Sequence, residues 1–167
     1  MVRGLLIVAT ISYINQRGKE LKGIFLTHCH QDHVYGLCEL LEIYPQTKVF
    51  CSRLAAQGLK EADVNLSYII LEYPFLFEHD DNVVILEENN HEINGLEIEV
   101  LSTPGHSDDN FTYIIGNNIF TGDSYIPFAK LFTKWPRSNK QQALENEQKL
   151  KQLIKERKLN VYQGHWW

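Results

Sequence analysis

The spacing of hydrophobic residues in the first third of the chain predicts short strands that alternate with helices. Apolar runs at residues 4–8 (GLLIV) and 23–27 (GIFLT) have the length of buried strands, and residues 11–17 suit a helix that ends at Gly18. Leucines at helical spacing predict a second helix over residues 34–43, which ends before Pro45. We therefore expect the chain to begin with a strand–helix–strand unit.

The middle of the chain changes to a pattern of strands. Residues 48–51, 68–71 and 83–86 are apolar runs of strand length, and a short helix is predicted over residues 54–59. We therefore expect strands in this part of the chain.

Two β-hairpins are predicted next, and each is marked by its turn. Asn94-Gly95 joins the apolar segments 91–93 and 96–101, which is a strong short-range hairpin signal. A Gly-Asn-Asn turn joins residues 112–115 to residues 119–121 in the same way. Both hairpins imply antiparallel pairing.

The last third of the chain predicts one long helix and a final strand. Ser138 is a suitable N-cap for an amphipathic helix that ends near Arg157, and residues 160–162 form the last apolar segment. This order of elements predicts an α/β (α+β) fold with layered mixed sheets. A length of 167 residues fits a single domain over residues 1–167.

Composition and charge narrow the class of protein. The net charge of −5 makes a nucleic-acid partner unexpected, because such partners usually meet a basic surface. No apolar stretch approaches the roughly 18 residues of a membrane span. The three cysteines form no Cys-x-x-Cys pair, which favours reduced thiols and a cytoplasmic location.

The segment after the predicted strand 23–27 is rich in side chains that bind metals. Its candidate ligands are His28, His30, Asp32 and His33. A turn between a buried strand and a helix can direct several side chains at one point, and imidazole together with carboxylate suits Zn²⁺ or a similar cation. An exposed histidine cluster is the alternative, which this spacing directly after a strand disfavours. Cys29 and Gln31 are interpreted as spacers.

Three later strand ends add one candidate ligand each. Pro104-Gly105 forces a turn that presents His106, a strand and Gly122 precede Asp123, and the final strand leads to His165. Each signal alone is typical of an ordinary loop. Together they place ligand types at four strand ends, and loops held by a rigid sheet are where catalytic sites form.

These blocks resemble the metallo-β-lactamase superfamily, and within it the glyoxalase II-like hydrolases. The resemblance rests on Phe25-Leu26-Thr27-His28, Thr103-Pro104-Gly105-His106 and Phe120-Thr121-Gly122-Asp123, which follow in the family's order. It implies an αββα sandwich whose site lies at one edge of two packed sheets. Only 27 residues precede His28, so part of the N-terminal β-sheet is expected to be missing, with possible truncation at both ends. Alternatively, another subunit of a homo-oligomer is expected to cover the exposed sheet edge.

The resemblance also implies a metal site and a reaction. The implied ligands are His28, His30 and His106 for one divalent cation, Asp32, His33 and His165 for the other, and Asp123 as a bridge. Zinc is favoured, with iron or manganese as alternatives. The implied reaction is hydrolysis of a small-molecule thioester or related ester by a metal-bridging hydroxide, with Asp32 and Asp123 as the catalytic carboxylates.

Other functions remain open at this point. A persulfide dioxygenase of the same family would use one iron on His28, His106 and Asp123, although the intact remaining ligands favour two metals. A non-catalytic, metal-stabilised interaction domain is suggested by the short N-terminus. A nuclease is disfavoured by the acidic charge, and a β-lactamase by the ligand pattern.

Side chains for substrate binding are harder to identify. Tyr125, Lys134 and Arg137 follow the Asp123 block, where related enzymes have substrate-contacting loops. They could bind a substrate carboxylate. A solvated loop is the interpretation that we favour.

Overall fold

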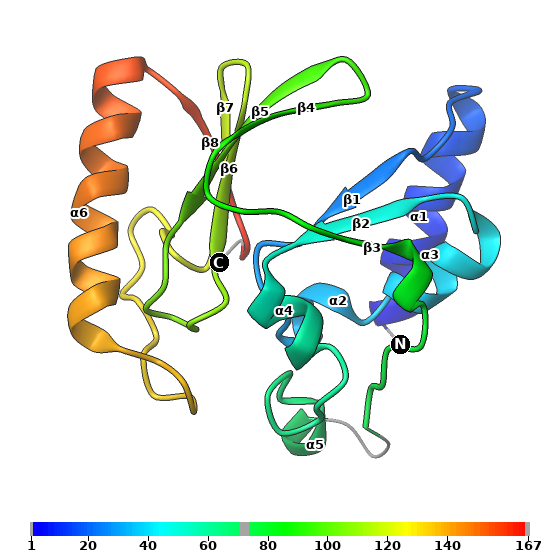
Figure 1. The fold of residues 1–167 in the computed structure, drawn as a ribbon, viewed down its shortest axis with the longest axis horizontal. Coiled ribbons are helices and arrows are strands. Elements are labelled where there is room, and N and C mark those ends of the chain that lie inside the picture. The colour runs from blue at the N-terminus through cyan, green and yellow to red at the C-terminus, as the bar shows by residue number, and fades with distance from the viewer. Residues whose placement is uncertain (1, 71–73, 166–167) are drawn as a thin grey trace.

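Two β-sheets lie side by side in the centre of the molecule, and each has helices on its outer face (Figure 1). The computed structural model describes residues 2–70 and 74–165. The first sheet contains three parallel strands, β1 (Gly23–Phe25), β2 (Lys48–Cys51) and β3 (Val83–Ile85), in that order. The second contains five, β4 (Asn90–Ile93), β5 (Leu96–Ser102), β6 (Phe111–Ile115), β7 (Asn118–Gly122) and β8 (Asn160–Gln163).

The second sheet is mixed. Its first four strands pair antiparallel, and β8 pairs with β7 in parallel. The remaining elements are α1 (Val2–Gln16), α2 (Gln31–Val34), α3 (Leu37–Ile43), α4 (Arg53–Gly58), α5 (Ser67–Ile70), the 3-10 helix η1 (Asp80–Asn82) and α6 (Lys140–Arg157). In Figure 1, α6 covers the outer face of the second sheet, while α1 and α3 lie beyond the first. No helix in the described ranges is long and apolar enough to cross a membrane.

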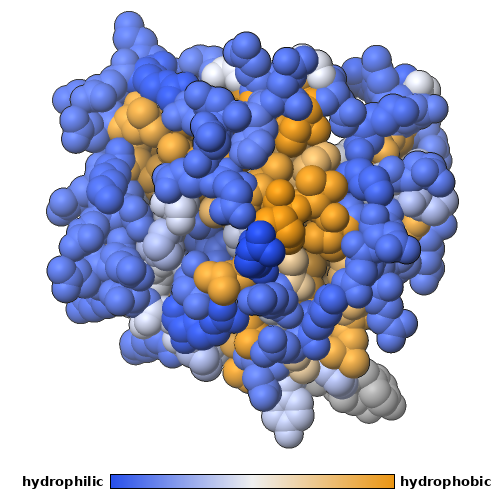
Figure 2. Space-filling model, viewed as in Figure 1, coloured by the Kyte–Doolittle hydropathy of each residue, from blue (hydrophilic) through white to orange (hydrophobic). Residues whose placement is uncertain are grey.

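Three groups of buried residues fill the spaces between the layers. Leu26, Val49 and neighbours pack the first sheet against α3 and α4. Phe50 and Tyr113 belong to the group between the sheets, and Ile119 and Leu150 to the group beneath α6. Hydrophobic residues also gather at the surface in the space between the two sheets (Figure 2). The arrangement confirms the predicted αββα architecture, since two sheets pack together with helices on their outer faces.

The N-terminal prediction was wrong in one respect. Residues 4–8 are part of helix α1 rather than a strand, so the chain begins helix–strand. A short apolar run cannot be assigned by periodicity alone, and here it continues to Gln16 without a breaking residue. The predicted end was correct. Gly18 has a φ of +56°, and the N–H of Lys19 donates to the Ile14 carbonyl at 3.2 Å, which closes the helix.

Two further predictions need correction. Residues 68–70 of the predicted strand 68–71 belong to helix α5, and Leu71 lies outside the described residues. Asn65 accounts for the change, because its side-chain oxygen accepts the N–H of Ser67 at 2.9 Å and starts a helical turn. The cap of α6 is Asn139 rather than Ser138. The predicted helix over 34–43 is divided into α2 and α3 around Gly36.

Candidate metal centre

Four strand ends meet at one edge of the two sheets and bring the predicted ligands together. The segment after β1 contributes His28, His30, Asp32 and His33. The loop after β5 contributes His106, the residue after β7 is Asp123, and His165 follows β8. Among the described residues, three overlapping groups have ligand atoms within 4.8 Å of one another: His28, His30 and His106; His28, His33 and Asp123; and Asp32, His33 and His165.

Asp123 lies at the centre of this cluster. Its Oδ2 atom is 3.5 Å from His106 Nε2 and 3.3 Å from His165 Nε2, and its Oδ1 atom is 3.5 Å from His33 Nε2. The Asp123 carboxylate therefore faces an imidazole of the first group and two imidazoles of the third. Asp32 lies at the more exposed end, where its Oδ2 atom is 3.3 Å from His165 Nε2.

Several buried atoms in the cluster have no hydrogen-bond partner. They are His28 Nε2, His33 Nε2 and Asp123 Oδ1. His30 Nδ1 and His106 Nε2 are 3.0 Å apart, two ring nitrogens directed at each other. A buried polar atom without a partner costs free energy, so unpaired donors and acceptors that converge on one point are expected where a cation binds. The residues fit divalent metal ions on this ground.

The pKa values of the histidines differ with their surroundings. Burial, together with the neighbouring imidazoles, lowers the pKa of His28 well below its ordinary value. Burial and then His106 lower the pKa of His30 to about 4. Burial also opposes charge on His33, yet the adjacent Asp123 carboxylate raises its pKa. His28 and His30 are therefore neutral near pH 7 and keep the lone pairs that bind metals.

Neighbouring groups orient two of the imidazoles. His106 Nδ1 is 2.8 Å from the Phe132 carbonyl oxygen, which can only accept, so the ring donates from Nδ1 and leaves Nε2 free. His28 Nδ1 is 3.1 Å from Thr27 Oγ1, and its Nε2 atom points into the cluster. A partner on the far ring nitrogen is the usual arrangement for histidines that bind metals.

Asp109 is a residue that the sequence analysis did not single out. Its buried carboxylate accepts the N–H of Cys29 at 2.8 Å and the hydroxyl of Ser107. Cys29 lies between His28 and His30, and Ser107 follows His106. Asp109 thus joins the two segments that bear the group of His28, His30 and His106. The sequence signal that could have identified Asp109 is the pair of aspartates that directly follows the Pro104–Ser107 turn.

Gly164 provides the clearance that the cluster needs. A Cβ atom at this position would clash with Asp123 Oδ1 and lie 2.7 Å from His33 Cε1. The glycine therefore lets β8 approach closely enough to bring His165 to the other ligands.

Cys29 has the structural role that was predicted for it. Its thiol is buried against Gly58 of α4, and it belongs to none of the candidate ligand groups of the described residues. Burial, followed by the charge of Asp109, raises its pKa.

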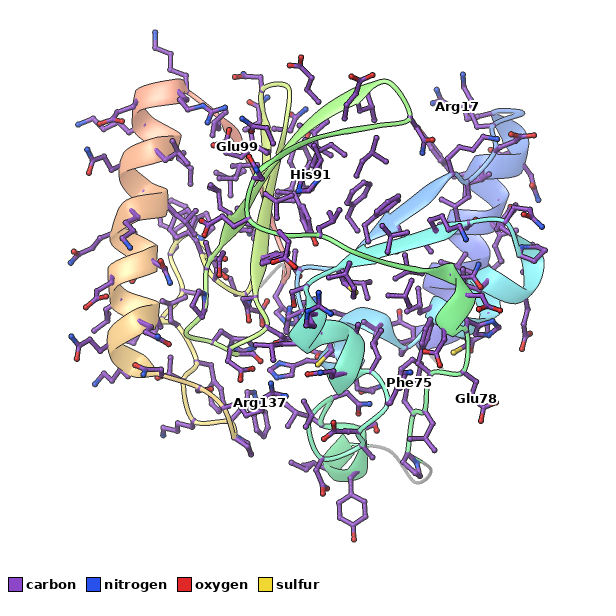
Figure 3. The ribbon with its side chains drawn as sticks, viewed as in Figure 1. Arg17, Phe75, Glu78, His91, Glu99 and Arg137 are labelled. Atoms are coloured by element: carbon purple, nitrogen blue, oxygen red, sulfur yellow. The ribbon has the colours of Figure 1, made fainter. Side chains whose placement is uncertain are left out.

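The three polar side chains of the loop between Asp123 and α6 lie away from the ligands, as the favoured interpretation of a loop without substrate contacts expects. Arg137, which is labelled in Figure 3, pairs with Asp108. Its Nε and Nη2 atoms are each 2.9 Å from Asp108 Oδ2. Tyr125 packs beneath α6, and Lys134 is exposed. None of the three lines the pocket beside the ligands, whereas Lys130 and Trp135 do.

Comparison with known proteins defines the class. The family model described as the metallo-beta-lactamase superfamily matches residues 3–165. The chain belongs to the metallo-β-lactamase superfamily.

Alignments with individual relatives cover part of this chain and part of each relative. It is 32% identical over 140 residues to a protein of Streptococcus pyogenes named "Probable metallo-hydrolase", with 77% of this chain and 57% of that protein covered. It is 27% identical over 114 residues to a hydroxyacylglutathione hydrolase of Tolumonas auensis, with 68% of this chain and 38% of that protein covered. The chain thus spans between 38% and 57% of these relatives' length.

A solved structure shows the same fold. TTHA1623, crystallised in a di-iron-bound form, superposes with a TM-score of 0.78 at 24% identity, covering 95% of this chain and 76% of that one.

Proposed function

We propose that this chain is a metal-dependent hydrolase of thioesters or related esters. His28, His30 and His106 would hold one divalent cation, Asp32, His33 and His165 the other, and Asp123 would bridge them. The observation that supports this proposal best is the convergence of unpaired buried atoms from His28, His33 and Asp123 on one point.

The donor set supports two metals, with zinc favoured and iron or manganese as alternatives. Neutral imidazoles and carboxylates bind all three, so the ligands alone do not select one. When bound, such cations supply an ionised water near neutral pH and polarise a substrate carbonyl.

The protein's own residues would then position the reactants. Asp32 is the most exposed of the proposed ligands, with its side chain 46% exposed, and its carboxylate can accept a hydrogen bond from the attacking water. Burial acts to raise the pKa of Asp123, but the pairing with His33 and the neighbouring imidazoles outweigh burial and lower it, which favours the ionised carboxylate. The Phe132 carbonyl keeps His106 in the tautomer that binds metal.

The names of the relatives support the class of reaction. One is called a metallo-hydrolase, and another acts as a hydroxyacylglutathione hydrolase by its name. A cysteine or serine nucleophile is not required, and Cys29 points away from the site. The expected cytoplasmic location stays a prediction.

Elemental analysis combined with an activity screen tests the proposal. We expect about two metal ions per chain and hydrolysis of at least one class of thioester, lactone or ester. Chelation should abolish the activity, and metal should restore it. Metal-loaded protein without turnover across the panel would contradict the proposal and favour a non-catalytic, metal-stabilised domain.

A persulfide dioxygenase is the second candidate, because His28, His106 and Asp123 also provide two imidazoles and a carboxylate for a single iron. One iron per chain with oxygen uptake on a persulfide substrate would support it over hydrolysis.

The predicted homo-oligomer stays a prediction. It is supported by the position of β1 at an edge of the first sheet and by an apolar groove between the sheets, to which Phe25, Tyr113 and Phe120 contribute. Sedimentation equilibrium of the metal-loaded chain would measure the oligomeric state.

A further inference from the structure

A pocket of about 240 Å³ opens directly onto the proposed metal ligands. One wall consists of the ligands themselves: His30, Asp32, His106, Asp123 and His165. The other wall comes from two loops, one before α5 and one between β7 and α6. Its residues are Leu66, Ile126, Ala129, Lys130, Phe132 and Trp135.

The second wall is predominantly apolar. Leu66 and Ile126 are buried, with 2% and 8% of their surface exposed. The rings of Phe132 and Trp135 pack against each other, with centroids 5.1 Å apart. The polar atoms on this wall are the ammonium of the exposed Lys130 and the indole N–H of Trp135. A substrate group that entered would exchange water for aliphatic and aromatic carbon.

The wall is fixed relative to the metal ligands. Phe132 contributes its ring to the pocket and its carbonyl oxygen to His106, at 2.8 Å from Nδ1. On the same loop, the hydroxyl of Ser138 donates to the His106 carbonyl at 2.6 Å. The apolar wall is therefore held at a fixed position relative to the metal ligands, and a fixed position is what orients a bound substrate for attack.

We propose that this pocket receives an apolar acyl group, so that the preferred substrates are thioesters or esters of aliphatic or aryl carboxylic acids rather than of hydroxy acids. This inference rests on the proposed hydrolase function. The ligands line the pocket, so a group bonded to the attacked carbonyl can fill it, and its small volume and apolar wall favour the acyl group over a bulky polar leaving group.

The size of the pocket indicates which part of the substrate it can hold. Sites for whole drug-sized ligands usually have volumes of about 300 to 1,000 Å³, so this one has room for only part of a larger substrate. A bulky polar carrier thiol would remain outside, toward Lys130. An acyl hydroxyl would instead lose its water partners against a wall with few polar atoms.

The expected result is a dependence on acyl chain length. Each methylene moved from water onto apolar surface favours the bound state about fourfold. We expect kcat/KM to rise about fourfold per methylene from acetyl upward, until the pocket is full. A lactoyl thioester should be a poorer substrate than the butyryl thioester.

The experiment uses the metal-loaded full chain and S-acyl N-acetylcysteamine thioesters from acetyl to octanoyl, plus lactoyl. Phe132→Ala and Trp135→Ala should each lower the hexanoyl-to-acetyl ratio of kcat/KM at least tenfold. The matched control is Lys134→Ala, on the same loop but outside the pocket, which should keep the wild-type ratio. Metal content measured for each variant reveals any loss of the site itself.

A binding measurement provides a readout independent of turnover. Calorimetric titration of the metal-loaded protein with acetate, butyrate and hexanoate should show affinity that increases with length. The heat capacity change should become more negative, as for apolar burial.

The outcomes distinguish the two proposals. Turnover with a flat length profile, a preference for lactoyl, or an unchanged ratio in both variants overturns the apolar acyl pocket and leaves the hydrolase intact. No turnover of any thioester, lactone or ester overturns the hydrolase, and the calorimetry then decides whether the pocket selects apolar groups.

Discussion

Two buried polar clusters lie close together in this protein, and they differ in how their atoms are paired. One is the histidine cluster of the candidate metal centre. The other, here called the hydroxyl cluster, consists of Thr103, Asn110, Thr112 and Ser124, all less than 5% exposed.

The side chains of the hydroxyl cluster are hydrogen-bonded to one another. The Thr103 hydroxyl lies 2.9 Å from that of Thr112 and 3.0 Å from that of Ser124. The Ser124 hydroxyl in turn donates to the Thr103 carbonyl at 3.0 Å. In the histidine cluster, by contrast, His28 Nε2, His33 Nε2 and Asp123 Oδ1 have no hydrogen-bond partner, although the last two face each other at 3.5 Å.

The difference indicates what each cluster is for. Paired buried groups stabilise the fold by a modest net amount, whereas unpaired ones destabilise it unless a ligand completes them. The hydroxyl cluster is structural, because it fixes the loop that bears His106. The histidine cluster has the unpaired atoms that are expected where a ligand from outside the chain binds.

The largest expected effect is loss of metal when the central carboxylate is removed. Asp123→Ala should lose most of the bound metal and reduce hydrolysis by at least a hundredfold, because this residue faces ligands of both groups. Elemental analysis and kcat/KM measure it. Asp108→Ala is the matched control, since that carboxylate pairs with Arg137. Near-full occupancy in Asp123→Ala contradicts the bridging assignment.

Metal should stabilise the protein, since binding completes the unpaired atoms. At free metal about 100-fold above Kd, the folded state gains about 2.7 kcal/mol. For a domain of this size, this raises Tm by roughly 5 to 10 °C. Differential scanning calorimetry with and without chelator measures the shift. An unchanged Tm at saturating metal would contradict the interpretation of the histidine cluster as a metal site.

Asp109 joins the segments that bear His28, His30 and His106, so its removal should affect both stability and metal binding. Asp109→Ala leaves the buried N–H of Cys29 without its acceptor and should destabilise the metal-free protein by about 2 kcal/mol. Metal affinity should fall roughly 10- to 100-fold, as when groups that orient ligands are lost. Urea unfolding and competitive chelator titration separate the two effects. Full metal affinity would show that the His28–His30 segment does not need this anchor.

The smallest effect is expected within the hydroxyl cluster. Thr112→Val keeps the shape of the side chain and removes one buried hydroxyl, which should cost about 1 kcal/mol of unfolding free energy. Metal content should equal that of the wild type. A variant that lost metal would show that the hydroxyl cluster belongs to the site.

Local signals predicted much of the fold. The Asn94-Gly95 hairpin was correct because its turn conformation is determined by two adjacent residues, with φ of +53° and +77°. Residues 4–8 were assigned wrongly because an apolar run has no periodicity to separate helix from strand. Residues 68–70 were assigned wrongly because the Asn65 side chain, outside the run, starts a helical turn.

By itself, the sequence determined which residues have the chemistry to bind metal, because His28, His30, Asp32 and His33 are neighbours in the chain. Their spacing after a strand needed no tertiary information. Only the tertiary structure decided that His106, Asp123 and His165 join them, and that Asp109 and Phe132 orient them. His30 meets His106 across 76 positions of the chain and Cys29 meets Asp109 across 80, and such separations close only when the two sheets pack together.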